Sequence, residues 1–321
     1  MVKLFKKSKP KVLSLRDFHK KRETILFMRE VGGLGDILMH RMMFEDFKRV
    51  FPDCRIVWAV HPDYLEAAQN HPFVDEVVDF RQISIHDYII SYNTTTACGR
   101  YETKISPNAD MHRSDIWANH CGVLLTKHNM HLNIEPEAKM WAIDKIEKLK
   151  GTKKGPSVVL CPISAQIGKN LSKDQMMWLA TYLHHKGCFV FGLHTCPIFD
   201  LNPFPTVWGI CQKQWMAIID TADYVVSVDT SAFHCAGGLR KPLMGIFTYI
   251  CGLTYGKYYD FVLVQKHRQH DPSWTCGPCF NWPICPKSKA DVKPCLTEIN
   301  NEMLTNGVEE LFKRFPLAKH T

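Results

Sequence analysis

The alternation of short apolar runs with helical segments is the feature that most constrains how this chain folds. It is clearest near the start, where an apolar run at 24–28 precedes a glycine-rich turn at 31–36 and a segment of helical spacing at 37–50. The apolar run at 55–60 completes a strand–helix–strand unit. Because such units join parallel strands and cover both faces of a sheet with helices, the pattern predicts an α/β fold.

The same alternation restarts after the polar, glycine-containing segment 150–156, which is the best linker candidate. We therefore predict two Rossmann-like domains, each with a parallel sheet, facing a central cleft. The predicted divisions are a basic arm at 1–22, an N-terminal domain at 23–150, a C-terminal domain at 151–300 and a closing helix at 301–321. Other predicted elements of the first half are strands at 74–80 and 86–92 and helices at 111–125 and 140–149.

The N-terminal arm carries the whole net charge of +8, because residues 1–22 contain nine basic residues and one acidic residue. Such an arm can contact a polyanion, whether nucleic acid, anionic lipid or a phosphorylated glycan. The alternative is a solubilising tail with no partner. Both interpretations remain open.

Two features of the sequence concern location. The chain has no run of 18 or more apolar residues, and its basic N-terminus lacks the apolar core and cleavage site of a secretory signal. We therefore predict a cytoplasmic protein without a transmembrane segment, in which the 13 cysteines are mostly reduced.

The first candidate site is the turn that contains Gly32, Gly33, Gly35 and Asp36. Glycines allow a ligand to approach the backbone closely, and the start of the next helix offers unpaired N–H groups to an acceptor or a phosphate. The turn matches neither the dinucleotide-binding fingerprint nor a P-loop. Asp36 can cap the helix or, as a carboxylate at the cleft, act as a general base.

The second candidate site follows the predicted strand 224–228. Its polar turn begins another helix, whose amides and hydroxyls suit a diphosphate, and a histidine in the first helical turn faces the same space. The alternative for that histidine is a structural role. The residues are Asp229, Thr230, Ser231, Ala232 and His234.

A third segment, after the predicted strand 157–161, contributes Ser164 and Lys169. Both follow a strand of the same predicted sheet, so they can reach the same phosphate. Exposed loop lysines are common, so this segment supports a donor site only together with the other two.

Four cysteines cluster late in the chain, at positions Cys276, Cys279, Cys285 and Cys295. A C-x-x-C pair followed by two further cysteines within 20 residues suits a tetrahedral structural zinc ion. Four thiolates leave no open position on the metal for catalysis. The alternative is a loop of cysteines that are unligated or partly paired.

Three of these features together resemble a known family. They are the turn ending in Gly35 and Asp36, the motif S-x-D-T-x-x-x-H at 227–234, and the late cysteines. In this order and spacing they are similar to glycosyltransferase family 9, the ADP-heptose:lipopolysaccharide heptosyltransferase-like proteins of GT-B fold. The similarity runs from about residue 23 onward.

The resemblance implies an inverting transfer that needs no metal or other cofactor for catalysis. It assigns Asp36 as the base for the acceptor, Lys169 as a contact to the donor phosphate, and the 229–232 turn as the holder of the sugar and diphosphate. His234 matches the family histidine. Two positions depart from the family: His194 and Thr195 stand where an acidic residue is expected near the donor ribose, and Ser231 stands where glycine is frequent.

The expected function is therefore transfer of a hexosyl, heptosyl or pentosyl group from a nucleotide-sugar donor to a hydroxyl acceptor, such as a glycan of the lipopolysaccharide core. One alternative is transfer to hydroxymethylated bases of DNA, which the basic arm and the aromatic residues Trp274, Phe280 and Trp282 would suit. Another is a non-catalytic sugar-nucleotide-binding protein.

Overall fold

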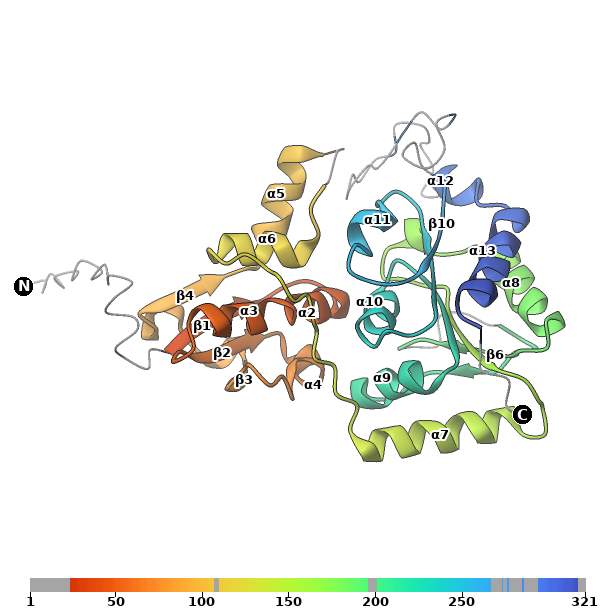
Figure 1. Ribbon diagram of the computed structural model, residues 1–321, viewed down its shortest axis with the longest axis horizontal. Helices are drawn as coiled ribbons and strands as arrows, with labels where there is room; N and C mark the ends of the chain where they lie inside the picture. Colours follow the sequence, from red (N-terminus) through yellow and green to blue (C-terminus); the bar gives the residue numbers. More distant parts are fainter. Residues whose placement is uncertain are drawn as a thin grey trace, which may run out of the picture.

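The computed structural model describes residues 24–106, 110–195, 201–266, 273, 276, 285 and 294–316. They form two lobes, each built on a parallel sheet with helices packed against it (Figure 1). The prediction of two α/β units with parallel sheets is confirmed. The basic arm lies outside the described residues, as do Cys279 and the three aromatic residues near it.

The first sheet has the strand order β3-β2-β1-β4, with every neighbouring pair parallel. Its central strand β1 is apolar and almost wholly buried, as expected where helices cover both faces. Since β2 and β4 flank β1 on opposite sides, the loop after β1 leaves the sheet where the strand order reverses, a position that favours ligand sites. The strands are β1 (Thr24–Arg29), β2 (Arg55–Val60), β3 (Glu76–Asp79) and β4 (Ile90–Asn93).

The second sheet has the order β10-β9-β8-β5-β6-β7, again all parallel. Its reversal point lies between β5 and β8, so the loops that follow these two strands meet at one edge. The strands are β5 (Ser157–Cys161), β6 (Phe189–Leu193), β7 (Thr206–Val207), β8 (Tyr224–Val228), β9 (Leu243–Phe247) and β10 (Val262–Gln265).

Several elements of the first lobe differ from the prediction, and the helix predicted at 111–125 spans only Arg113–His120. The predicted helix at 37–50 is two helices, because the Arg41 N–H bonds the carbonyls of both Ile37 and Leu38 at 3.3 Å and ends the first. Residues 85–87 form a 3-10 turn capped by Ser84, so the fourth strand starts only at Ile90. Helix α5 was not predicted. The helices are α2 (Leu34–His40), α3 (Met43–Val50), α4 (Leu65–Ala68), α5 (Ala97–Ile105) and α6 (Arg113–His120).

The helices of the second lobe include α7, which was predicted at 140–149 but begins earlier, with Pro136 in its first turn. It packs against α9, beside the second sheet (Figure 1). The domain limits inferred from sequence stay a prediction. The helices are α7 (Pro136–Lys150), α8 (Lys173–His185), α9 (Gln212–Thr221), α10 (Ser231–Gly238), α11 (Gly252–Tyr255), α12 (Pro294–Thr297) and α13 (Asn301–Arg314).

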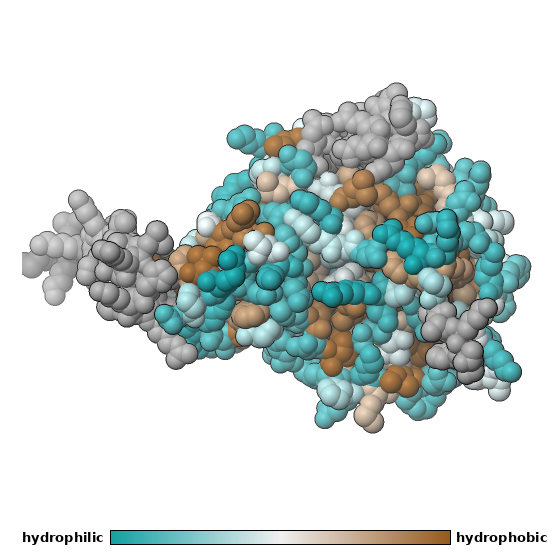
Figure 2. Space-filling view, in the orientation of Figure 1, coloured by the Kyte–Doolittle hydropathy of each residue, from teal (hydrophilic) through white to brown (hydrophobic). Residues whose placement is uncertain are grey.

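The lobes meet through packed helices. Helix α2 lies against α10, and one buried apolar cluster includes residues from both. On the described surface seen in Figure 2, hydrophilic residues predominate and apolar residues form separate patches. Within the described ranges, no helix combines the length and the apolar character that a bilayer crossing requires. The contact between α2 and α10 sets the starts of these two helices opposite each other.

Candidate active site

A cavity of about 570 Å³ lies between the lobes, at the ends of β1, β5 and β8. It brings together residues from all three segments singled out in the sequence. Gly32 does not line it, although the adjacent Gly33 does. The predicted residues that line it are Gly33, Gly35, Asp36, Ser164, Lys169, Asp229, Thr230, Ser231, Ala232 and His234.

Asp36 lies in the first turn of α2, where two arginines from other elements hold its carboxylate. Arg113 Nη1 donates to its Oδ1 at 2.7 Å, and Arg29 Nη2 lies 2.9 Å from its Oδ2. The Gly33 N–H also bonds Oδ2 at 3.3 Å, so the capping contact is present too. The cap and the cleft-facing carboxylate, which the sequence offered as alternatives, therefore occur together.

The charges around Asp36 control its ionisation. Burial alone would raise the pKa of this carboxyl, but the guanidinium groups of Arg113 and Arg29 outweigh burial and hold the pKa far below its usual range. Asp36 is therefore an anion at neutral pH. Its proton affinity is low as long as both arginines stay paired with it.

Two glycines of the turn allow these close contacts. Gly32 has φ +126°, and a Cβ there would lie 2.5 Å from Arg29 Nη2 and 2.7 Å from Asp36 Oδ2. Gly35 faces the other lobe, where a Cβ would lie 3.0 Å from His234 Cδ2 and 3.4 Å from Ser231 Cα. Gly32 thus leaves room for the ion pair, and Gly35 leaves room for the approach of the two lobes.

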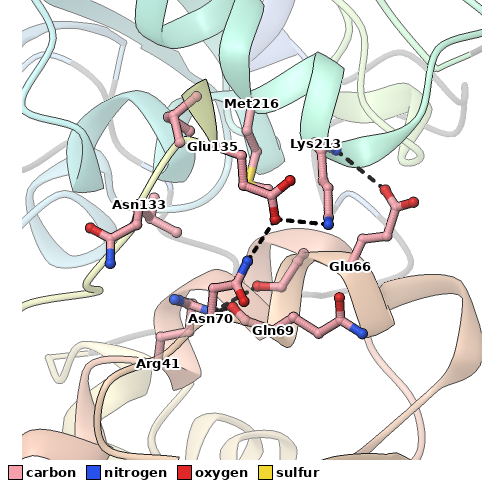
Figure 3. Close-up of a pocket in the computed structure, with 11 residues that line it drawn as sticks. Arg41, Glu66, Gln69, Asn70, Asn133, Glu135, Lys213 and Met216 are labelled. Carbon is pink, nitrogen blue, oxygen red and sulfur yellow. Dashed lines mark hydrogen bonds and ion pairs between the residues drawn. The ribbon is translucent and has the colours of Figure 1, made fainter. Parts of the chain in front are cut away.

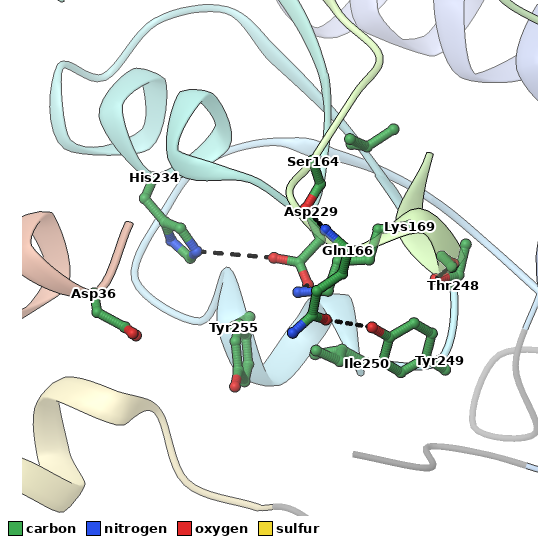
Figure 4. A network of polar contacts seen from close by, with 12 residues as sticks. Asp36, Ser164, Gln166, Lys169, Asp229, His234, Thr248, Tyr249, Ile250 and Tyr255 are labelled. Carbon is green, nitrogen blue, oxygen red and sulfur yellow. Dashed lines mark hydrogen bonds and ion pairs between the residues drawn. The ribbon is translucent and has the colours of Figure 1, made fainter. Parts of the chain in front are cut away.

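In the second lobe, Lys169 and Asp229 form a buried ion pair with Nζ and Oδ2 2.7 Å apart. His234 Nε2 lies 3.9 Å from Asp229 Oδ1 (Figure 4). The other ring nitrogen of His234, Nδ1, is 3.2 Å from the Tyr259 hydroxyl. Burial lowers the pKa of His234 to about 4, so the ring is neutral at pH 7 and acts as a hydrogen-bonding group rather than a cation.

Helix α10 begins at the cavity, directly after this ion pair. Thr230 is its N-cap residue, and the Thr230 side chain makes no capping hydrogen bond. The first N–H groups of a helix have no partner within the helix and carry its positive dipole end. The lysine and the helix start therefore offer positive charge to an anion in the cleft.

Several site residues had no recognisable sequence signal. Arg113 and Glu102 come from α6 and α5, which pack together, and Tyr255 reaches them from the second lobe. Gln265 on β10 fixes the loop that leads to Tyr255, since its amide donates to the Thr248 carbonyl at 2.9 Å and its oxygen accepts from the Gly252 N–H at 2.9 Å. Only their position in the fold reveals them.

A second contact between the lobes lies at the base of the cleft, around a cavity of about 20 Å³ (Figure 3). Lys213 Nζ on α9 and Asn70 Nδ2 each lie 2.8 Å from Glu135 Oε1. Beside them, the Ala67 N–H donates to Gln212 Oε1 at 3.2 Å. These polar contacts join α4 to α9.

The cysteine cluster is only partly described. Cys276 and Cys285 are half-buried and Cys295 is buried, while Cys279 lies outside the described residues. Among the described residues, no three His, Cys, Asp or Glu side chains are grouped closely enough to hold a metal ion. The four-cysteine site stays a prediction.

Comparison with known proteins was informative only at the level of structure. No protein-family model and no curated protein sequence matches the chain. A family 9 glycosyl transferase from Veillonella parvula superposes with a TM-score of 0.68 and 12% identity, covering 92% of this chain and 99% of its own. The chain has the GT-B fold of family 9 glycosyltransferases.

Two further GT-B structures extend the similarity. ADP-heptose LPS heptosyltransferase II of E. coli has a TM-score of 0.65 and 12% identity, covering 91% of this chain and 99% of its own. The iron-containing dodecameric glycosyltransferase TibC of enterotoxigenic E. coli has a TM-score of 0.67 and 13% identity, covering 91% and 77%. The expected fold is confirmed, and at these identities the similarity concerns the fold.

Proposed function

We propose that this protein is a glycosyltransferase that moves a sugar from a nucleoside-diphosphate donor to a hydroxyl group of an acceptor. The main support for this proposal is that Asp36 of one lobe faces Lys169 and the start of α10 of the other lobe across one cavity. The reaction needs a base for the acceptor and a positively charged site for the leaving diphosphate, and these two groups face each other here.

The donor diphosphate would bind between Lys169 and the first amides of α10. Its charge competes with Asp229 for the lysine, so donor binding would release Asp229 from its ion pair and leave that carboxylate to accept hydrogen bonds from the sugar. Ser164, Thr230, Ser231 and the neutral His234 would contribute polar contacts from the same lobe. Charge held on the diphosphate makes it a better leaving group.

On the acceptor side, we assign Asp36 as the base of an inverting reaction without metal. The acceptor oxygen attacks the anomeric carbon, the bond from that carbon to the diphosphate oxygen breaks, and the hydroxyl proton passes to Asp36. In an oxocarbenium-like transition state the attacking oxygen becomes acidic as it bonds to carbon. A carboxylate of low proton affinity therefore suffices, because it receives the proton late.

The names of two GT-B relatives support a proposal for the donor and the acceptor. One of them, E. coli WaaC, was solved with ADP-2-deoxy-2-fluoro heptose and has a TM-score of 0.54 at 14% identity. We therefore propose an ADP- or other nucleotide-linked sugar as the donor and a glycan as the acceptor, with the reaction in the cytoplasm. The alternative of transfer to DNA rests on the sequence of the arm and on the aromatic residues Trp274, Phe280 and Trp282.

A thermal-shift panel of nucleotide sugars followed by a transfer assay tests this function. A donor at 100 times its Kd should raise the stability of the folded protein by about 2.7 kcal/mol. The stabilising donor should then give labelled glycan and free nucleoside diphosphate. Donor binding with neither transfer nor donor hydrolysis would contradict the proposal and favour a sugar-nucleotide-binding protein.

We also propose that Cys276, Cys279, Cys285 and Cys295 hold a structural metal ion, with zinc as the first expectation. Thiolates suit both zinc and iron, and TibC is described as iron-containing, so both metals belong in the measurement. Elemental analysis of protein purified without chelator should give one metal per chain. A metal-free, folded protein would contradict this site.

A further inference from the structure

A second buried carboxylate lies beside the proposed base. Glu102 on α5 is 3% exposed, and both its oxygens bind the same guanidinium that holds Asp36. Arg113 Nε donates to Glu102 Oε1 at 2.7 Å, and Arg113 Nη2 donates to Oε2 at 2.8 Å. The third nitrogen of Arg113, Nη1, is the one that bonds Asp36.

The charges of this cluster balance. Arg29 and Arg113 contribute two positive charges, and Asp36 and Glu102 contribute two negative charges. Since Glu102 takes two of the three nitrogens of Arg113, only Nη1 remains for Asp36. Without the charge of Glu102, the guanidinium of Arg113 would be free to donate to Asp36 from two nitrogens instead of one. It would then neutralise the charge of Asp36 more completely.

The cluster also reaches across the cleft. The Tyr255 hydroxyl of α11 donates to Glu102 Oε1 at 3.2 Å, and the Arg113 guanidinium carbon lies 5.2 Å from the centre of the Tyr255 ring. Figure 4 shows Tyr255 and Asp36 on facing sides of the cleft. Because Tyr255 belongs to the second lobe and the other members to the first, the chain of contacts is complete only when the lobes are together.

From these contacts we propose that Glu102 is a positioning residue for the reaction: it holds Arg113 away from full pairing with Asp36, and Tyr255 completes this arrangement when the lobes close. The inference rests on the proposed function, with Asp36 as the base. Glu102 itself does not line the cavity and need not touch the substrate.

The test is Glu102→Gln, which keeps the size of the side chain and removes its charge. We expect kcat to fall about tenfold, a fraction of what general-base assistance provides, because Arg113 then pairs more fully with Asp36 and makes it a weaker base. The KM of the donor should not change, because the donor contacts lie in the other lobe. Tyr255→Phe, which removes only the hydroxyl, should lower kcat less, and it covers the case in which Glu102→Gln does not fold.

A double-mutant cycle separates positioning from a merely structural role. If Glu102 acts through Arg113, then Glu102→Gln should have no further effect on kcat when combined with Arg113→Met. The matched control is Asp46→Asn, a buried carboxylate that bonds Thr126 outside the cleft and should lower stability but leave kcat unchanged.

Two outcomes would overturn the inference. One is an unchanged kcat in both folded variants, and the other is a loss in Glu102→Gln that adds fully to that of Arg113→Met. Either result leaves the proposed function intact as long as the wild type transfers sugar and Asp36→Asn does not. Absence of transfer by the wild type would instead refute the function itself.

Discussion

At the scale of single residues, Asp36 is both part of the structure and the proposed base. Replacing it with Asn keeps its shape and removes its charge, and Arg113 keeps Glu102 as a partner. We therefore expect Asp36→Asn to fold and bind donor but to lose transfer by roughly 10²–10⁴-fold. Donor affinity by calorimetry and turnover with labelled sugar check this, and a variant with near-normal turnover would leave Asp36 as a helix cap only.

The same substitution should change how stability depends on pH. In the unfolded chain the carboxyl takes up its proton near pH 3.8, whereas in the folded protein the arginines keep it ionised to lower pH. Below pH 3.8 the unfolded state therefore binds more protons, so this group makes stability fall with decreasing pH by up to about 1.4 kcal/mol per pH unit.

Asp36→Asn removes the contribution of this carboxyl to the pH dependence of stability. The variant should be less stable than the wild type at pH 7 by about 3 kcal/mol, since it breaks buried ion pairs, and the difference should narrow as the pH falls below 3.8. Urea unfolding at several pH values measures it. If the free energy of unfolding depended on pH in the same way for both proteins, Asp36 would not be held ionised in the folded state.

At the scale of elements, the approach of α2 to α10 depends on Gly35. A methyl group there would meet the His234 ring at 3.0 Å, so the ring or the lobe must shift by a few tenths of an ångström. We expect Gly35→Ala to cost about 1–3 kcal/mol of stability through overpacking and to lower kcat by separating the two halves of the site.

The matched control is Gly99→Ala on the exposed side of α5, where a Cβ meets nothing within 4 Å. It should be neutral or stabilising by up to about 1 kcal/mol, because Ala favours helix over Gly. Thermal unfolding and steady-state kinetics compare the two variants. Equal behaviour of both would show that the contact between α2 and α10 tolerates a methyl group.

The elements also show what the sequence can predict. The apolar strands β1, β5 and β8, and the polar turns after them, were predicted because buried parallel strands are continuous apolar runs that end at a ligand edge. The residues on these turns, Asp36 and Asp229 among them, do line one cavity.

Helix α5 and the residues that surround Asp36 could be recognised only in the tertiary structure. Helix α5 carries Arg100, Glu102 and Lys104 and has no apolar run, so its sequence gave no signal, although it supplies Glu102 to the site. Arg113 and Tyr255 are 142 positions apart in the chain and meet only because the lobes pack together. Long-range pairing of this kind leaves no local pattern in a single sequence.

At the scale of the whole molecule, the two lobes are joined by contacts of unequal strength. The hydrogen bond from Asn70 of the first lobe to Glu135 of the second is exposed, so it contributes little, about 1 kcal/mol or less. The packing of α2 on α10 is apolar and buried. Relative movement of the lobes would therefore rearrange the polar contacts in Figure 3 at low cost, while the contact beside Gly35 resists separation.

The last prediction concerns the N-terminal arm, whose sequence holds all of the net charge while the remainder of the chain is neutral. Deleting residues 1–22 should leave donor affinity unchanged, because the donor groups lie in the second lobe. For a glycan acceptor without phosphate, transfer should also be unchanged and nearly independent of salt.

If the acceptor is nucleic acid, affinity must fall steeply with salt, and removing several cationic contacts must both weaken binding and flatten that dependence. Transfer of labelled sugar to lipopolysaccharide core and to hydroxymethylated duplex DNA, each with the full-length and the shortened protein at two salt concentrations, measures this. Salt-sensitive transfer to DNA that requires the arm would refute the glycan acceptor proposed above.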